Sequence, residues 1–218
     1  ADMGPLIGEN RYLVKEGLKA LNDTRRIGLQ EMVKLAGLKL GELDTESISW
    51  ALGPRLNAAS RMDDASASYQ LLTTQSPEEA PHLAVQLQEK NTERQRLSNE
   101  VLSKAKGSLA YRAYSPLLIE GDESYWVGVI GLVAGKLVDE FHKPAIIISL
   151  GPELCRGSCR SIPEFNIVAA LEECHDLLCS FGGHPLAAGF TVARQNLAQL
   201  EERLMKLAMS QLSQLDLR

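Results

Sequence analysis

Apolar residues recur at helical spacing through the first part of the chain. In residues 9–21 and again in residues 28–36 they lie three or four positions apart, which predicts two short amphipathic helices. Asp44 or Thr45 is the predicted N-cap of a third helix. Residues 53–64 are polar or small and lead into a further helical pattern. We interpret residues 53–64 as a loop outside the core, because the stretch has few large apolar side chains.

A long helix is predicted next. Ser76 as the cap, Pro77 at the first helical position and Glu79 three residues after the cap form a strong helix-start signal. Leucine and valine residues then recur among charged residues as far as Gly107, which is a typical residue for a helix end. A helix of this length predicts a spacer between two domains.

The final third of the chain alternates between strand-like and helix-like apolar segments. Strands are predicted at 117–119, 144–149 and 187–192, and helices at 128–141, 166–179 and 197–215. Strands that alternate with helices predict an α/β layer architecture.

Composition and charge narrow the class of protein. The chain has 218 residues, with 23 Lys and Arg against 28 Asp and Glu and a formal net charge of −5. A protein that coats nucleic acid normally has a basic excess, so we expect any contact with nucleic acid to come from a local groove. No apolar run has the roughly 18 residues needed to cross a bilayer. The start of the chain lacks a secretory signal, and we expect an excised piece of a cytoplasmic protein with four reduced cysteines.

The most informative motif is FGGHPLAAG at residues 181–189. Gly182 and Gly183 let a backbone approach a ligand closely and leave main-chain N–H groups free to bind an anion. His184 can donate to a phosphate or transfer a proton. The same pattern also fits a plain glycine turn that enters a strand.

Two further stretches suit phosphate binding. Residues 156–161, with the sequence RGSCRS, are predicted as a loop that combines hydroxyl and guanidinium groups. A polar hairpin with solvated arginines has the same composition. Arg55, Asn57 and Arg61 place two arginines and an amide on the Gly-Pro loop, which suits a nucleic-acid backbone. The alternative is that both arginines form ion pairs with the two aspartates that follow.

Two other patterns favour structural explanations. The cysteines lack the paired C-x2-C spacing of zinc sites, and Cys174 and Cys179 fall in a predicted helix whose apolar face buries them. Residues 128–131, with the sequence GVIG, lack the Gly-Lys-Ser/Thr ending of a phosphate loop. We therefore expect these glycines to serve close helix packing.

Together these strings resemble the RecJ single-strand-specific exonucleases of the DHH phosphoesterase superfamily. Residues 1–11 resemble the last catalytic-domain motif and its following helix, and residues 53–65 resemble a string characteristic of RecJ. Residues 128–134, 157–161 and 182–189 resemble the DHH-associated domain. The resemblance implies an α/β protein in three parts. These are the helical C-terminal part of a DHH catalytic domain over 1–76, a connecting helix over 77–108, and a DHH-associated domain over 109–218 with a mixed sheet flanked by helices.

The resemblance also implies a function. It implies a parent enzyme that degrades single-stranded DNA from 5′ to 3′ to mononucleotides in DNA repair and recombination, using Mn2+ or Mg2+ to polarise the phosphodiester and generate the attacking hydroxide. Asp2 is the metal ligand that matches a family motif here, so we expect this piece alone to be inactive and to hold no metal tightly. His184 is implied to be catalytic. The implied substrate-binding residues are Arg55, Asn57, Arg61, Ser158, Arg160, Ser161, Gly182, Gly183 and His184.

Alternatives to this function stay open. Another phosphoesterase of the superfamily, acting on oligoribonucleotides or cyclic dinucleotides, would share the 182–189 string, but residues 53–65 favour RecJ. A non-catalytic nucleic-acid-binding module would keep the binding residues without the catalytic motifs. The expected partner is single-stranded DNA, with no membrane and with protein partners unknown.

Overall fold

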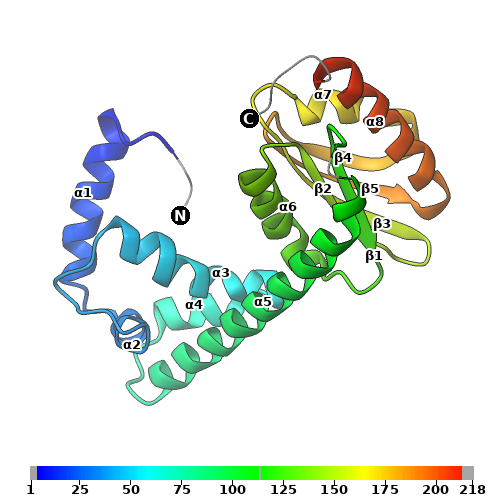
Figure 1. Cartoon of the computed structure of the whole chain (residues 1–218). Helices are drawn as coiled ribbons and strands as arrows, with labels where there is room; N and C mark the ends of the chain where they lie inside the picture. The colour runs from blue at the N-terminus through cyan, green and yellow to red at the C-terminus, as the bar shows by residue number, and fades with distance from the viewer. Residues whose placement is uncertain (1–3, 113, 213–218) are drawn as a thin grey trace. The chain divides into compact units, whose positions relative to one another are not determined.

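The computed structural model describes residues 4–112 and 114–212. The chain divides into two compact units, Ala1–Gln95 and Arg96–Arg218. The first unit is helical (Figure 1). Its elements are α1 (Gly8–Asn22), α2 (Ile27–Leu35), the π-helical segment η1 (Ser47–Leu52), α3 (Gly53–Met62), α4 (Ser66–Thr73) and the first part of α5 (Glu79–Leu109). Its core is built from the apolar faces of α2, α4 and α5, including Met32, Leu71 and Leu87.

The predicted loop at residues 53–64 is wrong, because most of it forms α3. Pro54 lies in the first turn of α3, which continues directly from η1. Ala58 and Ala59 are fully buried, and the Ser68 hydroxyl of α4 donates to the carbonyl of Leu56 at 2.6 Å. These small residues allow the helices to pack closely, so a small side chain in this stretch does not indicate an exposed position.

Individual hydrogen bonds confirm the predicted capping residues of two helices, Ser76 before α5 and Asp44 before η1. The Ser76 hydroxyl accepts from the backbone N–H of Glu79 at 3.2 Å. Asp44 Oδ1 accepts from the backbone N–H of Ser47 at 2.8 Å. Helix α5 is 31 residues long, and its two halves bury residues in different units. Ala84 lies in the core of the first unit and Ala105 in that of the second.

The second unit is an α/β layer structure with a mixed sheet, as predicted. Its strands are β1 (Leu118–Asp122), β2 (Ala145–Ser149), β3 (Leu154–Arg160), β4 (Leu178–His184) and β5 (Ala187–Ala193), in the order β1-β2-β3-β5-β4. The pair β1–β2 is parallel and the other pairs are antiparallel. The helices are α6 (Val127–Phe141), α7 (Ile167–Glu172) and α8 (Leu197–Leu212), with 3-10 turns η2 (Ala110–Arg112), η3 (His175–Leu177) and η4 (Arg194–Asn196).

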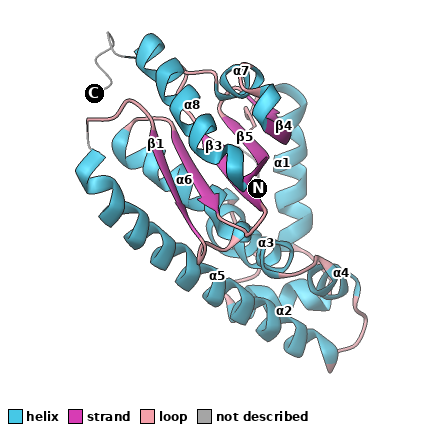
Figure 2. Cartoon of the chain, turned by 90° about the vertical axis from the view of Figure 1, so that its right-hand side faces the viewer, coloured by secondary structure: helices cyan, strands magenta, loops and turns pink. Residues whose placement is uncertain are grey.

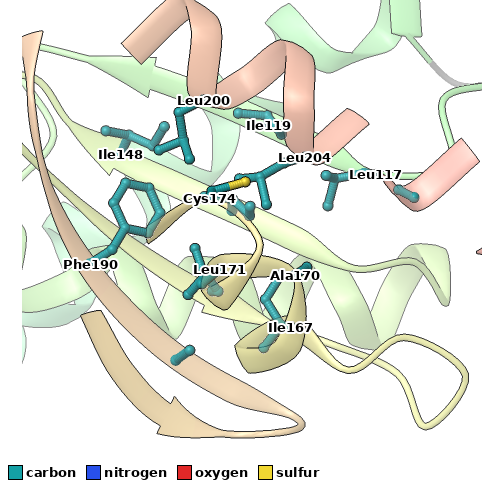
Figure 3. Packing of buried hydrophobic residues seen from close by; sticks show 14 of the residues in the cluster. Leu117, Ile119, Ile148, Ile167, Ala170, Leu171, Cys174, Phe190, Leu200 and Leu204 are labelled. Carbon is teal, nitrogen blue, oxygen red and sulfur yellow. The ribbon is translucent and has the colours of Figure 1, made fainter. Parts of the chain in front are cut away.

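Helices cover the two faces of this sheet unequally. On one face α7 and α8 pack over Ile148, Phe190 and neighbouring apolar residues (Figure 3). On the other face α6 and the second part of α5 pack over β1 and β2, where Ile147 is fully buried (Figure 2). Helix α6 thus covers one half of its face and leaves the β4–β5 half open to solvent.

Two stretches of the second unit differ from the prediction. The helix predicted at 166–179 ends at Glu172, and Cys179 lies in β4. Residues 156–160, predicted as a loop, belong to β3. The sequence of β3 contains no β-branched residue, so its strand state comes from the pairing with β2 on one side and β5 on the other.

Candidate nucleic-acid interface

The register of the sheet places four of the predicted binding residues on its partly open face, namely Ser158, Arg160, Gly182 and His184. Ser158 lies opposite Ile147, whose side chain packs under α6, so both belong to that face. The residues of β3, β5 and β4 that share this face form three rows across the sheet. The rows are Arg160–Ala187–His184, Ser158–Gly189–Gly182 and Arg156–Thr191–Ser180. Residues that are distant in sequence are thereby brought side by side.

The rows differ from the opposite face in exposure. Ala188, Phe190 and Val192 of β5 are buried against α7 and α8, whereas the residues between them are only half-buried. On β4, Ser180, Gly182 and His184 are exposed. Since β4 is the edge strand, one side of its backbone has no partner in the sheet. This surface offers side-chain and main-chain donors together.

Arg160 is held in place beside Ser158. Its Nη1 donates to the carbonyl of Cys159 at 2.8 Å and lies 3.4 Å from the Ser158 hydroxyl. Gly131 of α6 lies against the same pair, since a Cβ on Gly131 would meet Ser158 Oγ at 2.8 Å and Arg160 Nη2 at 3.3 Å. Gly131 thus has the predicted role in close packing. The contact also orients Ser158 and Arg160, two of the predicted binding residues.

His184 and Arg156 keep their polar groups available. Both side chains are exposed, and neither makes a hydrogen bond or ion pair within the described residues. They lie in the first and the third row respectively, on strands that flank β5. A guanidinium and an imidazole that are free in this way are suited to bind phosphate oxygens.

The backbone requires glycine at only one of the two glycine positions of the motif. Gly183 has φ +145°, and a Cβ there would lie 2.3 Å from the carbonyl of Ala187. The backbone therefore requires glycine at this position. A Cβ on Gly182 would meet nothing within 4 Å, so the protein itself does not require glycine at position 182. Both glycines lie in β4, and the turn of this motif follows them at residues 185–186, before β5.

A shallow cavity of about 350 Å3 lies over the second and third rows. Val127 and Ile130, in the first turn of α6, form its apolar side. The polar side comes from Arg156, Ser158, Ser180 and Thr191. Sequence reasoning missed Ser180 and Thr191, because only the strand pairing shows that they belong with Arg156.

Ser161 lies apart from this surface. It is 8% exposed, and its hydroxyl donates to the carbonyl of Phe165 at 2.6 Å. Its backbone N–H donates to the carbonyl of Leu186 at 2.9 Å. These contacts join the end of β3 to the β4–β5 connection, so we assign Ser161 a structural role.

The remaining predicted binding residues lie on α3 in the first unit. Arg55 Nε donates to Gln88 Oε1 at 2.7 Å and its Nη1 to the carbonyl of Ala51 at 2.8 Å. Burial lowers the pKa of Arg55 from its ordinary value. Asn57 is exposed and Arg61 is half-buried, and their spacing of four puts them on one helix face. Arg55 thus ties α3 to α5, while Asn57 and Arg61 share another face.

Arg61 also has a basic neighbour on α5. Burial, and secondarily the charge of Arg61, lower the pKa of Arg94. Arg94 Nη2 donates to Oδ1 of Asn91 at 3.0 Å, and Asn91 is 2% exposed. Of the two aspartates that follow α3, Asp63 pairs with Lys90 at 3.3 Å and Asp64 accepts from the backbone N–H of Ser66.

Metal ligands are not gathered in the part of the chain that the structure describes. No group of three or more His, Cys, Asp or Glu side chains there is placed to hold a metal ion. Asp2 lies outside the described residues. Cys155, Cys159 and Cys174 are buried and Cys179 is exposed, so the cysteines face different surroundings. Among the described helices, none combines the length and apolar character of a membrane span.

Comparisons with known proteins agree with this geometry. Residues 112–211 match the DHHA1 domain family. Over 99% of its length the chain is 38% identical to the single-stranded-DNA-specific exonuclease RecJ of Bacillus subtilis (strain 168), of which it covers 28%. Crystal structures of RecJ from Thermus thermophilus with Mg2+ and with Mn2+ match with TM-scores of 0.86 at 31% identity. These matches cover 96% of this chain and 33% and 31% of those chains.

The chain spans about a third or less of the length of these relatives. Nearly the whole of it aligns with them in sequence and in fold, and the sheet unit coincides with the DHHA1 match. The comparisons therefore support a segment of a RecJ protein that includes a DHHA1 domain.

Proposed function

We propose that this chain supplies the substrate-binding part of a metal-dependent exonuclease that degrades single-stranded DNA from 5′ to 3′. The observation that carries the proposal is that Arg160 and His184 flank Ala187 in one row of the open sheet face. The relatives are named as single-stranded-DNA-specific exonucleases, which gives the substrate class. DNA repair and recombination in the cytoplasm is the setting that we propose for the parent protein.

The surface suits a strand held by its backbone. Arg160, Ser158 and His184 donate hydrogen bonds, and such donors bind phosphate oxygens without reading base identity. At Gly182 nothing of the protein fills the space above the backbone, so a phosphate or sugar can approach the sheet there. An exonuclease that removes every nucleotide in turn needs contacts of this sequence-independent kind.

We assign His184 the catalytic role closest to the reacting atoms. Its exposed imidazole donates a hydrogen bond to an oxygen of the scissile phosphate, while Arg160 balances the charge that grows on that phosphate. Asn57 and Arg61 on α3 supply a second set of backbone contacts from the first unit. Because bulk charge is −5, the strand is held by these few cationic groups and by bound cations.

A divalent cation, Mg2+ or Mn2+, would supply polarisation of the phosphodiester and an activated water in the parent enzyme. The described residues do not provide a donor set for it, so no step of the proposed chemistry is assigned to a metal held by them. We place the metal-binding groups in the rest of the parent protein, together with Asp2.

Turnover by the parent enzyme tests the proposal. His184→Ala should lower kcat/KM on long single-stranded DNA about tenfold to a hundredfold, as expected for a lost charge-assisted hydrogen bond. His175→Ala is the matched control, because His175 is also exposed but lies on η3, where its ring nitrogen contacts the carbonyl of Glu172. Turnover by His184→Ala equal to that of the control would remove His184 from the site.

A choice of substrates separates the proposal from another superfamily phosphoesterase. The parent enzyme should hydrolyse long single-stranded DNA with a higher kcat/KM than short oligoribonucleotides or cyclic dinucleotides. The reverse preference would identify it as a phosphoesterase of small nucleotides. Absence of hydrolysis in the presence of Mn2+ or Mg2+ would favour the non-catalytic binding module.

A further inference from the structure

The third row of the open face contains a set of polar groups that the proposed chemistry does not use. Arg156, Thr191 and Ser180 lie opposite one another on β3, β5 and β4. The cavity of about 350 Å3 lies directly over them. Arg156 is exposed and has no intramolecular polar partner within the described residues. A guanidinium without a structural contact on the floor of a cavity is available to a ligand.

We propose that this row is a second phosphodiester subsite, which binds the DNA strand several nucleotides away from the Arg160–His184 row. The inference rests on the proposed function and deepens it, because it states the length of strand that the sheet recognises. Arg156 binds the phosphate as a fork of N–H donors, and the hydroxyls of Thr191 and Ser180 donate to the remaining oxygens.

The spacing of the rows sets this length. Arg156 and Arg160 are four residues apart on one strand, which corresponds to about 13 Å at roughly 3.3 Å per residue. A stacked nucleic-acid strand advances about 3.4 Å per nucleotide. A dinucleotide is therefore too short to reach both rows, whereas an oligonucleotide of several residues spans them.

The cavity wall supports a nucleotide in preference to a free anion. Val127 is 44% exposed although it is apolar, and it lines the cavity beside Ile130. Opposite this apolar wall lie the cation and the two hydroxyls. A sugar or base against α6 with its phosphate over Arg156 satisfies both sides, whereas inorganic phosphate would leave the apolar wall exposed to water.

Binding of short and long strands by the parent protein tests the inference. Fluorescence anisotropy would measure the Kd of a 5′-phosphorylated deoxythymidine dinucleotide and of an octanucleotide, at several matched salt concentrations, with EDTA present to prevent cleavage. Arg156→Ala should weaken octanucleotide binding about tenfold and leave the dinucleotide Kd unchanged. It should also reduce the salt dependence of octanucleotide binding by about one charge.

Three variants make the outcome decisive. Ser180→Ala should weaken octanucleotide binding by less than Arg156→Ala does, again with the dinucleotide Kd unchanged. Arg160→Ala should weaken the binding of both oligonucleotides. Lys206→Ala is the control for net charge, since Lys206 is exposed on α8, the helix that covers the other face of the sheet.

Failure of the inference and failure of the proposed function give different results. Octanucleotide binding by Arg156→Ala equal to that by Lys206→Ala would overturn the second subsite, provided that Arg160→Ala still weakens binding. An equal loss for both ligands would also overturn it, because Arg156 would then act within the first row. If Arg160→Ala binds both ligands as wild type does, the proposed function itself fails.

Discussion

A Cβ on Gly131 of α6 would lie 2.8 Å from the hydroxyl oxygen of Ser158 on β3. The helix can approach the sheet this closely only because position 131 has no side chain. Ser158 and Arg160 are thereby kept half-buried, with the Arg160 guanidinium 3.4 Å from the Ser158 hydroxyl. The contact links a packing residue to the proposed binding surface.

Gly131→Ala should therefore weaken DNA binding more than it affects stability. The new methyl group displaces the Ser158 hydroxyl and the neighbouring guanidinium, and we expect about a tenfold rise in Kd for single-stranded DNA. The strain is offset in part by the higher helix propensity of alanine, about 1 kcal/mol over glycine. Anisotropy titration and urea unfolding would measure the two effects.

Gly135→Ala is the matched control on the same helix, because a Cβ there meets nothing within 4 Å. This variant should raise the free energy of unfolding by up to about 1 kcal/mol and bind DNA as wild type does. Wild-type affinity in Gly131→Ala would separate the glycine from the binding surface.

The neighbouring glycines of β4 should respond in opposite ways to the same substitution. Gly183→Ala forces alanine into φ +145° against the carbonyl of Ala187, and should lower the free energy of unfolding by about 1–3 kcal/mol. Gly182→Ala should change stability by less than about 0.5 kcal/mol yet weaken DNA binding, because its methyl group occupies the space reserved for the strand. Thermal unfolding and anisotropy together distinguish these outcomes. Unimpaired binding by Gly182→Ala would contradict close approach at this position.

The four cysteines should differ sharply in reactivity. Burial raises the pKa of the Cys159 thiol to about 12, an effect that the nearby Arg160 charge only partly opposes. Since the thiolate is the reactive form, Cys159 should stay unmodified at about pH 8. Cys179 is exposed on the edge strand β4 and should react with a disulfide reagent in the native protein. Mass spectrometry would locate the label. The Cys179→Ser variant should lack the fast labelling reaction that we expect of the native protein. Rapid native labelling of Cys159 would show that the core around it opens.

Asp122 should make stability depend on acid pH. Its carboxylate accepts from Lys104 at 2.7 Å and from the backbone N–H of Ser124 at 2.8 Å. These contacts, with the Lys104 hydrogen bond the larger, lower the pKa of Asp122 to about 2. A lowered pKa means that the stabilisation is complete above the ordinary value of 3.8 and is lost as the pH falls towards 2.

Asp122→Asn measures this contribution. Because the carboxylate is partly exposed, we expect the variant to be less stable at about pH 7 by only about 0.5–1 kcal/mol. The difference from wild type should shrink as the pH falls from about 4 to about 2. Urea unfolding at several pH values would follow it. A difference that persists at the acid end would assign the effect to packing instead of charge.

The candidate site was only partly predictable from sequence. The string around His184 and the RGSCRS string led us to propose Arg160 and Ser158 as phosphate-binding residues, because glycine, hydroxyl and guanidinium groups together suit phosphate oxygens. The RGSCRS string was predicted as a loop, whereas residues 156–160 lie in β3. Thr191 and Ser180 carried no local signal, and the sequence did not show that the Ser161 hydroxyl donates to the carbonyl of Phe165.

The amino-acid sequence by itself determined the elements that depend on local rules. The start of α5 follows from Ser76 and Glu79, and the buried strand β2 follows from its run of isoleucines, because caps and apolar runs act over a few residues. Only the tertiary structure decided that β3 is a strand and that Arg156 shares a row with Thr191 and Ser180. Strand pairing joins residues distant in sequence, and the pleat then selects which side chains meet on one face. That selection, rather than any single motif, creates the surface on which we propose that the DNA strand lies.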